Sequence, residues 1–269
     1  MKPYLILVLI FIFSIESGSS QNSNEKINIG EKAVLKSEIY NEDFNLLIWL
    51  PTSYNDSNKK YPVVYRLDGE WFFLPTSGDV YHLVYNDEIA PEMIVVCIQN
   101  NNRGRDMLPP ISEYAPEGAS VDKFLLFLKN EAIPFIDNLY RTNDFRILCG
   151  QSTSGFFTLF TFIKDPALFN AYISISPSSA DCKPFIQDLA QKTKMTEDRK
   201  RTMVHVSYGG NDREKAIGLS AAHLLDILIG KGKDRDDHFN WKMEAFENEG
   251  HVPRSAFYEG LKWIFENIE

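Results

Sequence analysis

One short stretch of this sequence has the residue types and the spacing of a serine nucleophile. Leu148 to Gly155 reads LCGQSTSG, with an apolar run, Phe145 to Cys149, leading into it and a second run of helical length, Phe156 to Ile163, after it. That order of strand, tight turn and buried helix is what a nucleophile elbow requires, because only small residues fit where strand and helix pass close together. The stretch therefore predicts Ser152 as the nucleophile of an acyl-transfer reaction.

The stretch departs from the usual pattern at one position. The pattern is G-x-S-x-G, and Ser154 stands where the second glycine is expected. Taken alone, the stretch could equally be an ordinary strand-to-helix turn of small residues. A nucleophilic serine further requires a base, an acid that orients the base, and donors for the developing oxyanion. In α/β folds each of these is expected at the carboxyl end of a strand.

Among the five histidines, His251 has the position of a catalytic base. It follows Glu249-Gly250, directly after the last predicted strand, and precedes Val252-Pro253 and the final helix. A loop at that place leaves the imidazole free to reach back over the sheet. The other four are expected to be structural or solvated: His82, His205, His223 and His238.

The acid is expected after the strand that ends at Tyr208. Asp212 lies in the glycine-rich turn just beyond it, and Glu214 is the alternative. Either carboxylate could instead only stabilise the dipole of the helix that follows. With Asp212 as the acid, the order along the chain is Ser152, Asp212, His251, which is the order of α/β-hydrolases.

Two backbone N–H groups are predicted to form the oxyanion hole. One belongs to Thr153, which follows the nucleophile. The second is expected from the turn after the third strand, where Asp68-Gly69-Glu70 lies, and we assign it to Glu70. The alternative for this second segment is a plain Asp-Gly turn.

A long loop and several aromatic residues are candidates for substrate binding. The loop runs from Asn100 to about Ala119, and loops of this length are usually functional or disordered. Arg103 in this loop could bind a substrate acid, although an ion-pair network with Arg105 and Asp106 that pins the loop is favoured. The candidate pocket walls, which could equally be core residues, are Trp71, Phe72, Phe73 and Phe156.

The elements that must position these residues alternate between strands and helices. Strands are expected at 33–40, 44–50, 61–67, 93–99, 145–149, 171–176, 203–208 and 241–246. Helices are expected from Val121, with Ser120 as N-cap and a kink or end at Pro134, and at 156–163, 216–229 and 257–268. This alternation predicts an α/β fold with a mostly parallel sheet, antiparallel opening strands at its edge and helices on both faces.

Composition limits the class of protein. The chain has 269 residues, 44% of them hydrophobic, and a net charge of −9 without a basic patch, so we expect no nucleic-acid partner. Lys2, the apolar run from Tyr4 to Phe13 and small residues up to Ser20 predict a signal peptide over residues 1–20, rather than a stable membrane anchor. Residues 21–269 then form one domain, secreted to the periplasm or the exterior.

The three cysteines, Cys97, Cys149 and Cys182, form neither a disulfide framework nor a zinc site by their spacing. Cys97 and Cys149 are expected to be small core residues because they lie in apolar runs. A pairing of two of the three stays open. The predicted chemistry requires no metal and no organic cofactor.

With these residues in view, the chain resembles the esterase family of α/β-hydrolases that includes enterochelin esterases, S-formylglutathione hydrolases, feruloyl esterases and mycolyltransferases. The resemblance spans about residues 33–265 and rests on five segments in order. They are Val64-Tyr65-Arg66-Leu67-Asp68-Gly69-Glu70, the NNRGRD loop at 100–106 with Pro109, Gly150-Gln151-Ser152, Ser176-Pro177-Ser178, and Gly250-His251-Val252-Pro253 with Tyr258-Glu259-Gly260-Leu261. The resemblance implies Ser152 as nucleophile, His251 as base and an acid at the position of Asp212.

Together these features predict a secreted serine esterase that acts through an acyl-enzyme. The substrate is expected to be a small-molecule, carbohydrate or siderophore ester, and the oligomeric state stays open. Two alternatives remain: an acyltransferase that uses the same triad, and a non-catalytic hydrolase fold that binds a glycan or a partner. Segment 179–182, SADC, stands where the family often has bulky aromatic residues, which leaves the shape of the acyl or alcohol pocket undetermined.

Overall fold

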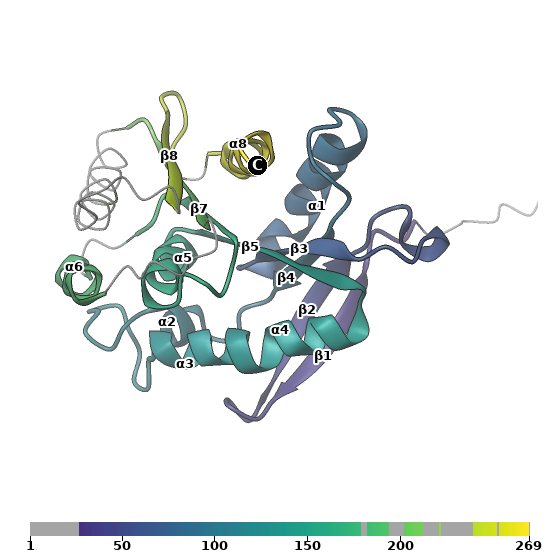
Figure 1. Ribbon diagram of the computed structural model, residues 1–269. Coiled ribbons are helices and arrows are strands. Elements are labelled where there is room, and N and C mark those ends of the chain that lie inside the picture. The colour runs from purple at the N-terminus through teal and green to yellow at the C-terminus, as the bar shows by residue number, and fades with distance from the viewer. Residues whose placement is uncertain are drawn as a thin grey trace, which may run out of the picture.

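Alternating strands and helices build one mixed sheet with helices on both faces (Figure 1). The computed structural model describes residues 27–178, 182–193, 202–211, 221, 239–251 and 253–268. These residues form eight strands: β1 (Glu31–Ser37), β2 (Glu42–Trp49), β3 (Tyr61–Arg66), β4 (Ile94–Ile98), β5 (Thr142–Gln151), β6 (Ala171–Ile175), β7 (Thr202–Gly209) and β8 (Phe239–Phe246). Their order across the sheet is β1-β2-β4-β3-β5-β6-β7-β8.

The antiparallel edge and the parallel centre are those that the sequence predicts. β1 pairs with β2, and β2 with β4, in antiparallel register, whereas the six strands from β4 through β3, β5, β6 and β7 to β8 run parallel to one another. The β1–β2 hairpin turns at Asn41, whose φ of 55° lies in the left-handed region that asparagine tolerates. The predicted strand ends differ from the observed ones by a few residues.

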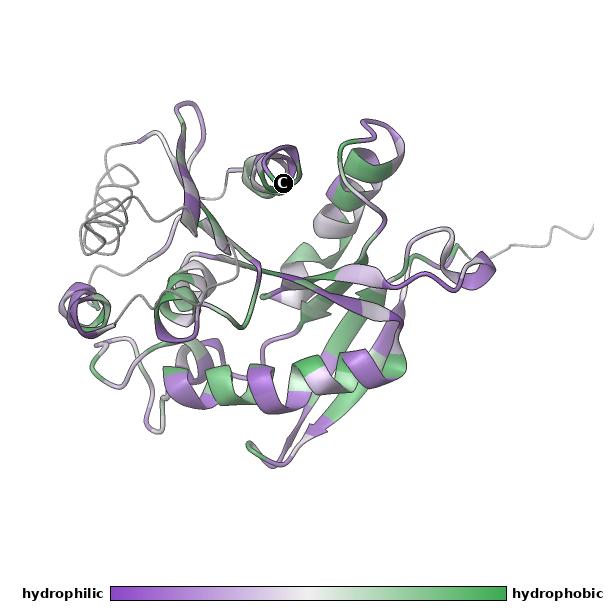
Figure 2. Ribbon diagram, viewed as in Figure 1, coloured by the Kyte–Doolittle hydropathy of each residue, from purple (hydrophilic) through white to green (hydrophobic). Residues whose placement is uncertain are grey.

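Two layers of helices enclose the sheet. α1 (Gly69–Tyr85) and α8 (Ala256–Glu266) lie against one face. The helices on the other side are α2 (Arg103–Met107), α3 (Val121–Phe127), α4 (Ile133–Leu139), α5 (Thr153–Lys164) and α6 (Lys183–Lys192). β4 and β6 are buried along their whole length, and Figure 2 shows hydrophobic (green) stretches in the sheet, because parallel strands covered on both faces meet no water.

The side chains of β3 and β5 alternate between two apolar clusters. Val64, Ile147 and Cys149 belong to the cluster under α1 and α8. Tyr65 and Leu148 belong to the cluster on the other side, under α3 and α5. All five are fully buried. This double burial fixes the register of the two strands, because a slip by one residue would exchange the sets that face each cluster.

One helix is longer than the sequence suggests. The sequence predicts only a turn at Asp68-Gly69-Glu70, but α1 begins there, continues through Tyr85 and includes His82 in its last turn. Its helical periodicity is weak because Trp71 and Leu74 are exposed and Pro75 lies inside it. The short helices α2 and α6 were also not predicted from the sequence.

The helical segment that starts at Val121 continues past Pro134, with an irregular π-helical turn just before it. Ser120 caps α3 as predicted, since its hydroxyl accepts the N–H of Lys123 at 3.3 Å. A π-helical turn, Leu128–Ala132, then joins α3 to α4, and Pro134 lies in the first turn of α4. The wider turn accommodates proline, because the first turn of a helix does not need its missing N–H.

All three cysteines lie in the described part of the chain, and each is buried and outside any disulfide. No pair of them forms a disulfide, which closes that alternative. Burial raises the pKa of the Cys149 thiol. Among the described residues, no helix has the length and apolar character needed to span a membrane. The predicted helix over 216–229 lies outside the described residues except for Ala221, and so does the predicted signal peptide.

Candidate active site

Ser152 lies in a strained turn between β5 and α5. Its backbone has φ 58° and ψ −117°, a conformation that non-glycine residues adopt only where surrounding structure imposes it. A Cβ added at Gly150 would lie 2.1 Å from the carbonyl oxygen of Ser154, and one at Gly155 would lie 2.7 Å from that of Ile175. Both glycines are therefore required by close backbone contact, and the turn has the geometry of a nucleophile elbow.

His251 reaches the serine from the loop between β8 and α8. Its Nε2 lies 2.8 Å from Ser152 Oγ, which is hydrogen-bond distance for a base and a nucleophile. Gln151 supports this loop, since its Nε2 donates to the His251 carbonyl at 3.4 Å. A second support is the Glu249 carbonyl, which accepts the N–H of Gly210 at 3.1 Å. Ser152 and His251 are 99 positions apart in sequence, so tertiary folding alone brings them together.

The predicted acids, Asp212 and Glu214, lie outside the described residues. β7 ends at Gly209, and Asn211 is the last residue described before them. A third member of a triad thus stays a prediction from the sequence.

Two helix N-termini lie at the sheet edge where Ser152 stands. β3 and β5 are parallel neighbours, and the N–H of Leu67 donates to the Cys149 carbonyl at 2.9 Å. α1 starts two residues after Leu67, and α5 starts directly after Ser152. The N–H groups of Glu70 and Thr153 are in the first turns of these helices, where no acceptor within the helix is available. Both helix dipoles also favour negative charge at this edge.

The buried carboxylate of Asp68 joins the turn before α1 to its surroundings. Arg103 donates to it twice, from Nε to Oδ1 at 2.7 Å and from Nη2 to Oδ2 at 2.9 Å. Asn100 Nδ2 also donates to Oδ1, at 2.7 Å, and Ser154 Oγ lies 2.6 Å from Oδ2. The structure thus shows an ion pair for Arg103 rather than a free guanidinium.

The long loop is pinned by further ion pairs, as the favoured interpretation predicts. Arg105 binds Glu42 through two nitrogens, at 2.6 and 3.1 Å, and Asp106 through Nε at 2.7 Å. The hydrogen bonds from Arg105 hold the pKa of Glu42 below its usual value. Asn102 caps α2, because its side chain accepts the N–H of Arg105 at 3.1 Å. The loop is therefore tied both to the β1–β2 hairpin and, through Arg103, to Asp68.

The aromatic candidates for a substrate pocket divide into exposed and buried residues. Trp71 is 61% exposed on the first turn of α1, and the guanidinium carbon of Arg103 lies 5.8 Å from its ring. Phe72 is half-buried, with the buried Arg66 guanidinium 4.0 Å from its ring. Phe73 packs partly buried against the cluster under α1 and α8, and Phe156 is a core residue. Of this set, Trp71 is free to meet a ligand.

The other histidines in the described part of the chain have structural partners. His205 is fully buried in β7, with Nε2 3.1 Å from Glu244 Oε2, and burial lowers its pKa. The hydrogen bond from His205 lowers the pKa of Glu244 to about 2. His82 binds Asp87 at 3.2 Å. His223 and His238 lie outside the described residues.

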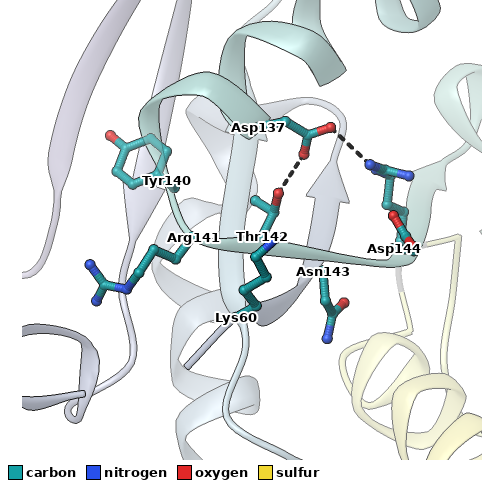
Figure 3. Close-up of a pocket in the computed structure, with 8 residues that line it drawn as sticks. Lys60, Asp137, Tyr140, Arg141, Thr142, Asn143 and Asp144 are labelled. Atoms are coloured by element: carbon teal, nitrogen blue, oxygen red, sulfur yellow. Dashed lines mark hydrogen bonds and ion pairs between the residues drawn. The ribbon is translucent and has the colours of Figure 1, made fainter. Parts of the chain in front are cut away.

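A hollow of about 360 Å³ lies at the opposite edge of the sheet, at the amino end of β5. Figure 3 shows the carboxylate of Asp137 at its margin. That group accepts hydrogen bonds from Thr142 Oγ1 at 2.7 Å and from Arg146 Nη2 at 2.8 Å. Because Ser152 follows the carboxyl end of β5, this hollow is separate from the candidate active site. Within the described residues, no cluster of His, Cys, Asp and Glu side chains could hold a metal ion.

Sequence reasoning missed Asp68, Asn100 and Ser154 as parts of the site. The available signals were the departure of Ser154 from the glycine pattern and the place of Asp68 at the end of β3. Neither signal showed which residues each side chain would contact, because the contacts join segments 32 to 86 residues apart.

A mostly parallel sheet with a strained serine elbow after a central strand defines an α/β-hydrolase fold. The chain belongs to the esterase family: the family model described as "Putative esterase" matches residues 37–243. Membership places the chain among the carboxylic ester hydrolases.

Individual relatives share between 19% and 26% sequence identity with this chain. The uncharacterized protein YjcH of Bacillus subtilis is 26% identical over 204 residues, which are 74% of this chain and 79% of YjcH. An IroE-like serine hydrolase from Shewanella oneidensis has a TM-score of 0.77 and 24% identity, with 89% of this chain and 82% of that chain covered. The siderophore hydrolase EstB from Aspergillus nidulans has a TM-score of 0.71 and 19% identity, with 89% and 96% covered. These two solved structures share the fold of this chain.

Proposed function

We propose that this ester hydrolase acts through Ser152 as nucleophile and His251 as general base. The observation that carries the proposal is the 2.8 Å contact between Ser152 Oγ and His251 Nε2 at a strained elbow. We further propose Asp212 as the acid that orients the imidazole, with Glu214 as the alternative. Support for the acid is its place after β7 in the sequence.

The proposed reaction has two steps. Ser152 Oγ attacks the ester carbonyl as its proton passes to His251 Nε2, and the N–H groups of Thr153 and Glu70 donate to the oxyanion. The C–O bond to the alcohol then breaks, and the departing oxygen takes the proton from His251. Water attacks the acyl-enzyme in the same way, which releases the carboxylic acid and returns the proton to Ser152.

We propose a small-molecule ester as the substrate. Family membership supports ester hydrolysis, and the siderophore hydrolase EstB has the same fold. Siderophore esters are therefore the first natural substrates to test, with acetylated or feruloylated carbohydrates and simple acyl esters as the comparison set. Trp71 is the exposed aromatic that could contact an acyl or alcohol group in this site.

The mechanism is tested by intact-mass spectrometry after exposure to a fluorophosphonate. We expect one adduct on the wild-type protein and none on Ser152→Ala, because only an activated serine reacts. Ser120→Ala, which removes a helix-capping serine outside the site, should be labelled like the wild type. A wild-type protein that stays unlabelled, or equal labelling of Ser152→Ala, would contradict the proposal.

We also propose that residues 1–20 are removed as a signal peptide during secretion. The pattern of a positive residue, an apolar run and small residues supports this. The same mass spectrum, taken on protein from a secreting host, tests it: the mature chain should begin at Gln21. A mass that includes residues 1–20 would contradict the cleavage.

A further inference from the structure

The Asp68 carboxylate is placed to hold other segments together rather than to cap its own helix. Asp68 is the N-cap residue of α1, yet its side chain accepts no capping hydrogen bond and its backbone is left-handed, with φ 59°. It is fully buried. A buried carboxylate is costly unless it is paired and hydrogen-bonded. Every contact described for its oxygens goes to Arg103, Asn100 or Ser154.

Ser154 is the direct link between this carboxylate and the elbow. Its Oγ lies 2.6 Å from Asp68 Oδ2, 2.9 Å from the backbone carbonyl oxygen of Gln151 and 2.6 Å from the backbone nitrogen of Gln151. A serine hydroxyl has one proton, and an ionised carboxylate is a stronger acceptor than a carbonyl. The hydroxyl therefore donates to Asp68 and accepts the N–H of Gln151. A glycine at this position could make neither bond.

Arg103 reinforces this connection, and Asn100 braces the segment that carries Glu70. Arg103 Nη2 donates both to Asp68 Oδ2 and to the Gln151 carbonyl, the latter at 2.8 Å. Asn100 joins Asp68 to the first turn of α1. Its Nδ2 lies 2.7 Å from Asp68 Oδ1 and 2.8 Å from Glu70 Oε1, and its N–H donates to Glu70 Oε2 at 3.1 Å. The turn before α1 and the elbow before α5 are thus joined through Ser154 and Arg103, while Asn100 holds Glu70 to Asp68 within the first of these segments.

We infer that Ser154 and Asp68 are positioning residues that set the relative placement of the two oxyanion donors. Glu70 follows Asp68 by two residues, and Thr153 immediately precedes Ser154, so the Ser154–Asp68 hydrogen bond joins the two segments that carry the donor N–H groups. This inference rests on the proposed function. It gives a reason for serine where the usual elbow pattern has glycine, because the hydroxyl forms a hydrogen bond to Asp68 that glycine could not form.

The inference is tested by steady-state kinetics of Ser154→Ala and Ser154→Gly on a p-nitrophenyl ester. Both variants should lower kcat by about 10- to 100-fold and leave KM within about twofold, because misplaced donors weaken binding of the oxyanion and not of the ester. The inhibition constant of an arylboronic acid, which forms a tetrahedral adduct on serine, should rise by the same factor. Thr161→Val, which removes a buried hydroxyl of α5 that donates to the Phe157 carbonyl, should leave kcat unchanged.

A second variant guards against misfolding of the first. Asn100→Ala removes the side chain that links Asp68 to Glu70. Because Asn100 is only half-buried, the variant should fold, and it should also lower kcat without raising KM. Wild-type kcat and boronate affinity in either a folded Ser154→Ala or Asn100→Ala would overturn the inference, as would an equal loss of kcat in Thr161→Val. Fluorophosphonate labelling separates the two proposals: an unlabelled wild type refutes the proposed function, whereas a labelled wild type with normal Ser154 variants refutes only the positioning role.

Discussion

At the scale of single residues, the site depends on one backbone conformation. Ser152 holds a positive φ, and its neighbours fix that geometry through the backbone. The N–H of Ser152 donates to the Ile175 carbonyl at 2.8 Å, and its own carbonyl accepts from Phe156 at 2.9 Å and from Ser178 at 3.1 Å. Conformations of this kind cost about 1–3 kcal/mol and persist only where the surroundings impose them. The elbow therefore stores strain that the rest of the fold offsets.

We expect this strain to separate two inactive variants. Ser152→Gly and Ser152→Ala both lose the nucleophile, but glycine adopts a positive φ without steric cost. After its larger entropy in the unfolded chain is subtracted, Ser152→Gly should be more stable than Ser152→Ala by about 1 kcal/mol. Urea unfolding measures the difference. Ser174 lies in the regular strand β6, so there the alanine variant should be more stable than the glycine variant. If glycine is the more stable at both positions, the backbone at Ser152 is not strained.

At the scale of elements, α1 and α8 cover the same face of the sheet but meet it differently. Gly260 of α8 faces β7, and a Cβ there would lie 2.9 Å from His205 Nδ1 and 3.0 Å from Ile173 Cγ2. Gly78 of α1 is exposed, and a Cβ there would meet no atom within 4 Å. One glycine allows close packing of helix on sheet, whereas the other lies on an open surface.

Alanine at these two glycines should therefore have opposite effects. Gly260→Ala gains helix propensity but forces a buried imidazole and an isoleucine methyl to shift, so we expect a net loss of about 1–3 kcal/mol. Gly78→Ala gains about 0.5–1 kcal/mol from helix propensity alone. Thermal unfolding of both variants measures the pair. The packing argument fails if Gly260→Ala is as stable as the wild type.

At the scale of the whole molecule, one carboxylate couples stability to pH. Burial raises the pKa of Asp79 to about 6 from its ordinary 3.8, and the nearby Arg66 only partly opposes this. Between these two values the folded protein binds a proton that the unfolded chain has released. The free energy of unfolding therefore falls as pH rises from about 4 to 6, and the loss persists at neutral pH.

Replacement of this carboxylate should consequently stabilise the protein only where the group is ionised. Asp79→Asn should raise the free energy of unfolding at pH 7 by about 1–2 kcal/mol, a value reduced for solvent screening of a partly exposed group. At pH 4 the effect should vanish. Asp56→Asn, at a solvent-exposed position, should change stability little at either pH. Equal effects of Asp79→Asn at both values of pH would contradict the assignment.

Much of the architecture follows from local patterns in the sequence. The strands of the central sheet are short apolar runs that end at glycine or polar residues, and such runs are recognisable without knowledge of their partners. The long helix α1 was missed because Trp71 and Leu74 face solvent and Pro75 interrupts the pattern. The sequence predicts an irregularity near Pro134 but not its form, which is a π-helical turn over Leu128–Ala132.

The sequence by itself pointed to Ser152 and His251 as the candidate nucleophile and base, because small residues next to predicted strands mark the elbow and the loop that carry them. It could not determine the contacts of Asp68 and Ser154, or whether any two of the three cysteines form a disulfide. Those depend on distances between segments far apart in the chain, and only tertiary packing fixes such distances. Only the tertiary structure shows that the serine in place of the usual glycine forms a hydrogen bond between the first turn of α5 and the turn before α1, because only the folded chain places the Ser154 hydroxyl against the Asp68 carboxylate.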